Sequence, residues 1–177
     1  MSAQAPMADP SPNDPWRPAN DAGLPQEDVR QFLRTEHDQL LAMLDALRLE
    51  RDASRCKDGL RGVRTAWIVH ALAEETVVYR ALEGVQEPGS RADERFVEHE
   101  LVGGLFDRLA QAEAGSLEWN ARLSVARELI ARHIETEYRD LFPLLGRRYG
   151  VEALAEMGTR FRHARDMLMV LEEAKAA

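Results

Sequence analysis

Apolar residues recur every three or four positions along most of the chain, in five segments separated by glycine, proline and polar residues. This spacing follows the 3.6-residue turn of an α-helix. The segments cover, to within a few residues, 25–51, 58–83, 90–115, 116–149 and 151–174. No stretch alternates apolar and polar residues with the period of two that is typical of a β-strand. The pattern therefore predicts an all-α protein.

Residues at the segment boundaries are typical of helix ends. Pro25 suits the first turn of a helix, and Ser90 with Asp93 has the spacing of a capping box. Pro143, inside the fourth segment, should kink that helix. Short links between long amphipathic helices make sequence neighbours antiparallel. We therefore predict an up-down four-helix bundle with an additional C-terminal helix, as one domain over residues 25–177.

The first 24 residues have a different character, because they hold five of the eight prolines of the chain among alanine, asparagine and aspartate. Such a composition buries too little apolar surface to fold. We expect residues 1–24 to form a flexible arm. This stretch also has neither the basic start nor the apolar run of a signal peptide.

Charge and cysteine content exclude some classes of partner. The net charge of −8 is unfavourable for binding a nucleic-acid backbone, which requires a basic face. No apolar run approaches the 18 or so residues needed to span a bilayer, so we expect no membrane partner. Cys56 is the only cysteine, which rules out an internal disulfide and suits a reducing compartment. These features together predict a cytoplasmic protein.

Histidine and glutamate interrupt the apolar stripes of the first four segments. Each of these segments has one histidine at a stripe position; the one in the third segment comes three residues after Phe96. The second and fourth segments add a glutamate four residues later, on the same helix face as its histidine. Because consecutive histidines are about one helix and one turn apart, an up-down bundle brings them to one height. The resulting layer contains His37, His70, Glu74, His99, His133 and Glu137.

Such a layer suggests a metal site. Buried ionised carboxylates are unfavourable by several kcal/mol without a partner, and without metal the like charges of Glu74 and Glu137 should raise the pKa of one or both. Imidazole with carboxylate suits iron, manganese or zinc, and two HxxxE pairs in one bundle are typical of dinuclear centres. A single histidine in a stripe is usually a core or boundary residue. Four of them with two matched glutamates are much harder to explain in that way.

The order His…HxxxE…His…HxxxE resembles the hemerythrin-like (HHE cation-binding) domain over residues 26–170. The pairs Glu36-His37 and Glu98-His99 and the stretch EYRDLFP from Glu137 to Pro143 carry the resemblance. It implies a four-helix bundle around a non-haem centre of two iron ions. It also implies terminal histidine ligands and bridging glutamates, namely His37, His70, His99 and His133 with Glu74 and Glu137.

The chain departs from the pattern of the oxygen-carrying members of that family. Those proteins have two histidines one turn apart on the third helix, whereas here Arg95 and Gly103 stand one turn from His99. Further metal ligands could come from His163, Tyr79, Glu75 or Tyr138. Of these, we expect His163 at the boundary or surface, Glu75 in solvent and the Tyr79 hydroxyl at the rim of the bundle. The pair Gly103-Gly104 should allow a close helix crossing, or else an access path to the metals.

The resemblance implies a protein that binds or senses a small ligand such as dioxygen, nitric oxide or peroxide. Two alternatives remain open at this point. One is a di-iron enzyme that turns over peroxide or nitric oxide, and the other is an iron- or oxygen-responsive module that acts through a protein partner. The incomplete ligand set argues against a simple oxygen carrier.

Overall fold

The computed structural model describes residues 28–85 and 92–176, and every regular element in them is helical. The all-α prediction is therefore confirmed for this part of the chain. The predicted arm over residues 1–24 and the capping residue Ser90 lie outside the described residues. The elements are α1 (Val29–Leu49), α2 (Ala53–Glu74), η1 (Glu75–Tyr79), α3 (Ala92–Gln111), α4 (Leu117–Thr136), η2 (Glu137–Leu141), α5 (Phe142–Arg148) and α6 (Val151–Ala176).

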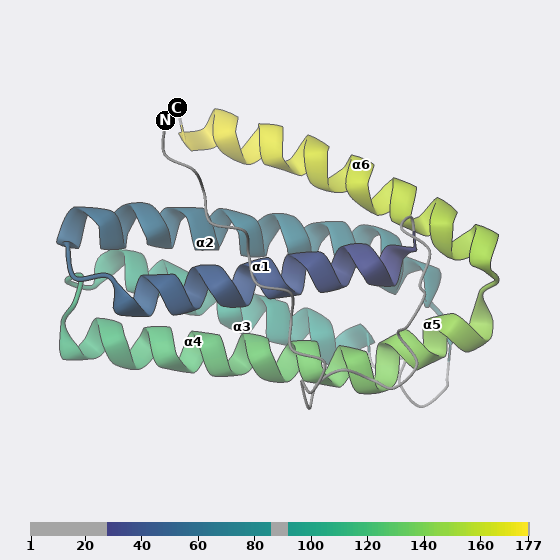
Figure 1. Cartoon of the computed structure of the whole chain (residues 1–177), viewed down its shortest axis with the longest axis horizontal. Coiled ribbons are helices and arrows are strands. Elements are labelled where there is room, and N and C mark those ends of the chain that lie inside the picture. Colours follow the sequence, from purple (N-terminus) through teal and green to yellow (C-terminus); the bar gives the residue numbers. More distant parts are fainter. Residues whose placement is uncertain (1–27, 86–91, 177) are drawn as a thin grey trace, which may run out of the picture.

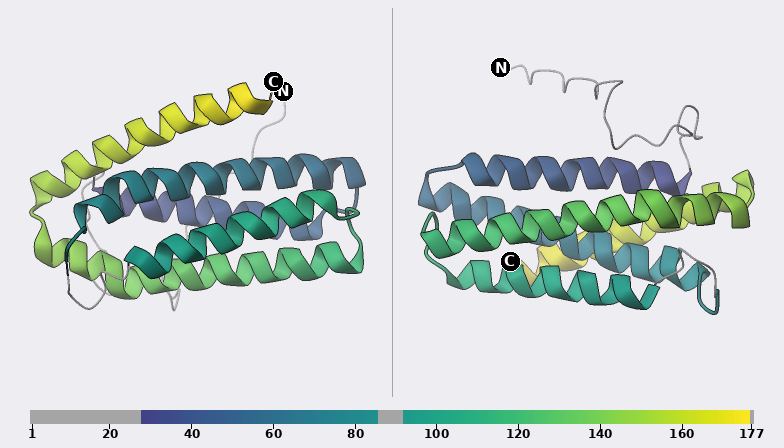
Figure 2. Two further views of the ribbon diagram at one scale, coloured as in Figure 1. Left: turned by 180° about the vertical axis from the view of Figure 1, so that it is seen from behind. Right: turned by 90° about the horizontal axis from the view of Figure 1, so that it is seen from below.

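Four long helices form the predicted up-down bundle. Figure 1 shows α1, α2, α3 and α4 lying side by side along the length of the molecule. Each packs against its sequence neighbours, and α1 also packs against α4, which closes the bundle. The additional helix α6 lies outside this group and packs on α1, α2 and η1, as the views in Figure 2 also show.

Side-chain caps define where several helices begin. The Asp28 and Asp52 carboxylates accept hydrogen bonds from the backbone N–H groups of Arg30 and Arg55, both at 2.9 Å. Such caps satisfy N–H groups that have no partner inside the helix. Because of the Asp52 cap, α2 begins at Ala53, several residues earlier than the sequence predicts.

The fourth predicted segment is a continuous run of three elements. α4 passes into the π-helical turn η2 and then into α5, which has Pro143 near its start. Proline cannot donate the backbone hydrogen bond of a regular helix. A π-helical turn therefore lies just before Pro143, where the sequence predicts a kink.

Two apolar clusters fill the interior. One lies between α1, α2, α3 and α4 and contains Trp67, Phe106, Trp119 and Leu123 among others. The other is formed by the first turns of α1 with η1, η2, α5 and α6, and contains Leu33, Leu145 and Phe161 among others. On α1, His37 stands between Leu33 of the second cluster and Leu40 of the first, so the polar layer lies where the clusters meet.

Two expectations for α3 are wrong. Phe96 was expected on the buried stripe but is 41% exposed, since α3 turns Arg95 and His99 inward instead. The glycines Gly103 and Gly104 do not mark a close crossing, because a Cβ atom added to either would meet no atom within 4 Å.

No helix in the described ranges is both long and apolar enough to cross a bilayer.

Candidate metal centre

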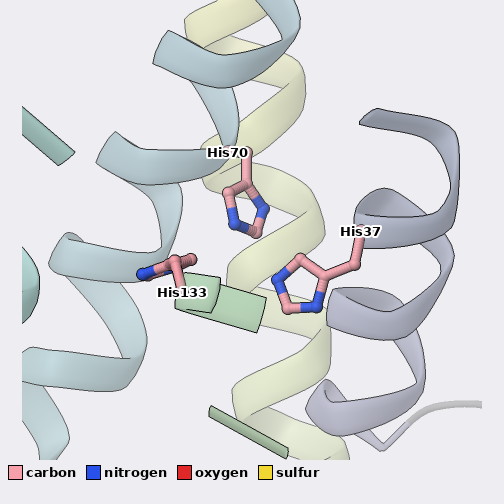
Figure 3. Close-up of side chains that lie close together, drawn as sticks. All are labelled: His37, His70 and His133. Carbon is pink, nitrogen blue, oxygen red and sulfur yellow. The ribbon is translucent and has the colours of Figure 1, made fainter. Parts of the chain in front are cut away.

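The helices bring the six predicted residues together in one buried layer. His37 comes from α1, His70 and Glu74 from α2, His99 from α3, His133 from α4 and Glu137 from the start of η2, and each is at most 5% exposed. Figure 3 shows the rings of His37, His70 and His133 pointing toward one another from three helices. Two overlapping groups have ligand atoms within 4.8 Å of one another, namely His37, His70 and His133, and Glu74, His99 and His133.

Glu74 lies among three imidazoles. Its Oε2 atom is 3.5 Å from Nε2 of His99 and 3.8 Å from Nε2 of both His70 and His133. The Nε2 atoms of His99 and His133 are 3.3 Å apart. One carboxylate therefore faces histidines from three different helices.

Glu137 faces the remaining histidine. Its Oε2 atom is 3.3 Å from Nε2 of His37, and its Oε1 atom is 3.6 Å from Nε2 of His133. The two oxygens of this carboxylate thus point to imidazoles on two different helices, α1 and α4, which is the placement a bridging carboxylate needs.

Several inward-facing atoms have no hydrogen-bond partner. They are Nε2 of His37 and His70, Oε1 of Glu74 and Oε2 of Glu137, and all four are buried. A buried polar atom without a hydrogen bond is unfavourable by about 1–3 kcal/mol. Lone pairs from neutral imidazole and carboxylate are the donors that metal cations accept. The residues present therefore fit a metal site.

A second ring of residues holds the histidines from outside. Each imidazole turns Nε2 inward and Nδ1 toward a carboxylate or phenol on another helix or turn. Such partners fix the orientation of a ligating histidine and make it more basic. The pairs are His70 with Glu36 at 3.0 Å, His99 with Glu75 at 2.8 Å, His133 with Glu98 at 3.2 Å and His37 with Tyr138 at 3.2 Å.

The roles of Glu75 and Tyr138 differ from those expected. Glu75 was expected in solvent, but its side chain is only 22% exposed because it reaches back to His99. Tyr138 reaches the outer nitrogen of His37, so it does not lie among the inward-facing groups. A sequence signal does exist, since both residues directly follow an HxxxE glutamate.

Tyr79 lies inside the layer, so its expected place at the rim is wrong. It is 1% exposed, and its hydroxyl is 2.8 Å from both Glu74 Oε2 and Glu137 Oε1. The π-helical turn η1 explains this position, because it brings residues five apart onto one face. Burial, together with the two carboxylates, raises the pKa of the Tyr79 phenol well above its ordinary value.

Trp67 closes the layer on the side of the first apolar cluster. Its ring lies 5.8, 5.3 and 5.7 Å from the rings of His70, His99 and His133, measured between centroids. A buried indole at this distance keeps water away from the three imidazoles, so charges in the layer interact strongly.

Burial and neighbouring charged groups shift the pKa of several groups in the layer. Burial alone would raise the pKa of the Glu137 carboxyl, but His133 and His37 outweigh burial and hold that pKa well below its usual value. Burial lowers the pKa of His37. It would do the same for His99, but hydrogen bonds with Glu74 and Glu75 instead raise the pKa of His99 to about 9. Neighbouring histidines therefore outweigh burial at Glu137, so this carboxyl is not the one with the raised pKa that the sequence predicts for one or both glutamates.

Arg95 is a part of the layer that sequence reasoning missed. It is 1% exposed, and its Nε atom lies 3.8 Å from Glu137 Oε1. Its position four residues before His99, on the same face of α3, is the signal that could have revealed it.

His163 lies on an exposed position of α6, which confirms its placement away from the layer.

Comparison with known families agrees with this geometry. The family model of the hemerythrin HHE cation binding domain matches residues 28–145, which is more than half of the chain. The matched range includes the six inward-facing residues and the four that hold the histidines. Comparisons with curated proteins and with solved structures give no match. On the family match, the chain belongs to the hemerythrin HHE cation-binding domain family.

Proposed function

We propose that the layer holds two iron ions and that this non-haem centre binds a small ligand such as dioxygen, nitric oxide or peroxide. The observation that carries the proposal is the convergence of four buried Nε2 atoms on two glutamates from different helices. In this assignment the histidines are terminal ligands and the glutamates bridge. The proposed ligands are His37, His70, His99, His133, Glu74 and Glu137.

Two features support a pair of metal ions. The two groups of potential ligand atoms overlap at His133 but draw their other members from different parts of the layer. Each glutamate also lies near histidines of more than one helix, as a bridge requires. The choice of iron over manganese or zinc follows the family, because imidazole and carboxylate suit all three metals.

Six protein ligands leave open positions on two ions. Tyr79 is better placed than His163 to fill one, because its hydroxyl already lies between the two glutamates. Tyr79 would release its phenol proton on taking up such a role, since metal binding and proton release are coupled. Positions that remain open are available to the small ligand.

A second candidate function is turnover of peroxide or nitric oxide by the same centre. The buried Tyr79 hydroxyl favours it, because a phenol at this place can donate a hydrogen bond or a proton to a bound ligand. Consumption of peroxide or nitric oxide by the iron-loaded protein, measured over many equivalents, distinguishes an enzyme from a binding protein.

Metal analysis of protein produced in iron-replete medium tests the central proposal. We expect about two irons per chain by elemental analysis and anomalous scattering at the iron edge from the layer. The double variant Glu74→Gln, Glu137→Gln should lose most of that iron. His163→Ala, which removes an exposed imidazole, should retain it. A single zinc, or no metal after anaerobic reconstitution, would contradict the di-iron centre.

A further inference from the structure

The layer is built from two halves that repeat one another. Glu36-His37 on α1 corresponds to Glu98-His99 on α3, and each of these glutamates contacts Nδ1 of the next histidine along the chain. Likewise Glu75 and Tyr138, each just after an HxxxE pair, contact Nδ1 of the histidine in the other half. Positions that break this repeat therefore reveal what distinguishes one side of the layer from the other.

Two positions break the repeat, one in each half. Four residues before its first histidine, the first half has Leu33 and the second half has Arg95. Five residues after its glutamate, the first half has Tyr79 and the second half has Phe142. All four side chains are buried. At each position one half has an apolar residue and the other a polar one: Arg95 comes from the second half and Tyr79 from the first.

The polar residues of this comparison meet at a single atom. Oε1 of Glu137 lies 2.8 Å from the Tyr79 hydroxyl and 3.8 Å from Nε of Arg95. The layer therefore has one polar side, formed by Tyr79 and Arg95. The fold itself does not require a charge there, because Leu33 fills the equivalent place in the other half.

A buried guanidinium changes which ligands are favoured. Arginine stays protonated under all physiological conditions, and in a poorly hydrated site its charge acts strongly on its neighbours. Once the glutamates neutralise bound cations, the charge of Arg95 adds to the positive charge of the site. An anion gains from that charge and can accept hydrogen bonds from the guanidinium, whereas a neutral diatomic gains little.

We propose that Arg95 is a specificity-determining residue that makes this centre favour small anions over neutral diatomic ligands. The inference rests on the proposed iron centre and deepens it by naming the class of ligand. It stands on the burial of Arg95, its distance from Glu137 and the apolar residue at the equivalent position.

The test uses azide as a stable anionic probe and nitric oxide as a neutral one. Optical titration of oxidised, iron-loaded protein with azide gives one Kd, and titration of the reduced protein with nitric oxide gives the other. Arg95→Met should raise the azide Kd by about tenfold or more, while Arg95→Lys should restore most of the affinity. The nitric oxide Kd should change by less than about threefold in both variants.

Matched variants separate the local charge from other effects. Arg64→Met removes the same charge from a surface pair with Asp107 and should leave the azide Kd near that of the wild type. Arg95→Gln, a neutral polar replacement, serves as the second neutral variant if Arg95→Met does not fold, with the same expected loss.

Three results would overturn the inference: an unchanged azide Kd at full iron content, an equal loss of azide and nitric oxide affinity, or loss of iron from Arg95→Met and Arg95→Gln. The third result would mean that Arg95 acts by positioning Glu137. Failure of the iron centre itself is detected separately, because the wild type would then contain no iron.

Discussion

Each histidine of the layer is oriented by a contact between its outer nitrogen, Nδ1, and a residue outside the six inward-facing ones. The outer nitrogen of His133 contacts Glu98, and that of His70 contacts Glu36, which also pairs with Arg165 of α6. These carboxylates keep Nε2 directed inward, so that a metal ion meets imidazoles already oriented. At the residue scale, the supporting ring is therefore as much a part of the site as the six inward-facing residues.

Removing one supporting carboxylate should weaken metal binding without unfolding the bundle. In Glu98→Gln the charge that orients His133 is lost, and we expect metal affinity to fall by about 10- to 100-fold. Competition with a chelator, followed optically, measures the change, and circular dichroism checks the helices. Glu100→Gln, at an exposed position of the same helix, is the control. Equal chelator resistance in the two variants would show that Glu98 has no such role.

At the scale of the element, departures from the regular α-helix place key side chains. Both HxxxE pairs end where a π-helical turn begins, η1 after Glu74 and η2 at Glu137. In a regular helix Tyr79 would lie about 140° around the axis from Glu74. The π-helical turn moves it onto the same face, which is why sequence periodicity placed its hydroxyl at the rim.

Helix α3 carries two glycines that neither packing nor backbone conformation requires. A Cβ at Gly103 or Gly104 meets no atom within 4 Å, and neither glycine has a positive φ. Replacing each with alanine should raise the free energy of unfolding by up to about 1 kcal/mol, because alanine has the higher helix propensity. Thermal and urea unfolding measure the effect.

Gly115 provides the contrast for that measurement. It has a φ of 81° in the turn before α4, so Gly115→Ala should destabilise the protein by about 1–2 kcal/mol. A destabilised Gly103→Ala, Gly104→Ala variant would mean that these glycines are needed for a contact or a motion of α3.

At the scale of the whole molecule, α6 belongs with the bundle although the family match ends before it. Phe161 of α6 is fully buried in the second apolar cluster, and its ring lies 6.5 Å from that of His70. Arg165 of the same helix pairs with Glu36. We therefore infer that α6 belongs to the same domain as the four long helices and covers the His70 side of the layer.

Global stability should also depend on the ion pair that joins α1 to α4. Arg127 donates two hydrogen bonds to Asp45, at 2.6 and 2.9 Å. These bonds, together with the nearby charge of Arg48, lower the pKa of the Asp45 carboxyl. A carboxyl with a lowered folded pKa stabilises the fold above its unfolded pKa, and this contribution disappears as pH falls through the folded value.

A double-mutant cycle with Asp45→Asn and Arg127→Gln measures that contribution. Because both side chains are partly exposed, we expect a coupling of about 0.5 kcal/mol near pH 6. The coupling should shrink toward zero as pH falls below about 4. The exposed pair Arg61–Asp58, which lies within α2 and joins no two helices, is the comparison. A coupling that stays constant down to pH 3 would contradict the role assigned to Asp45.

The sequence by itself determined the helices, the bundle and the six inward-facing residues. All of these follow from helical periodicity and from local spacing, which act within single helices and short links. Their assignment as metal ligands remains a proposal. The family assignment likewise followed from the order of the motifs, which the family model confirms.

Only the tertiary structure decided which groups surround that layer. The partners of the outer nitrogens lie on other helices or turns than their histidines, so local spacing does not show which histidine each of them contacts. The place of Tyr79 depends on a π-helical turn that apolar periodicity does not encode. The sequence marks Arg95 only as a residue one turn from His99, and the tertiary structure shows that its charge is buried beside Glu137. Long-range contacts and the π-helical turns therefore determine which groups surround the six inward-facing residues, including the polar side formed by Tyr79 and Arg95.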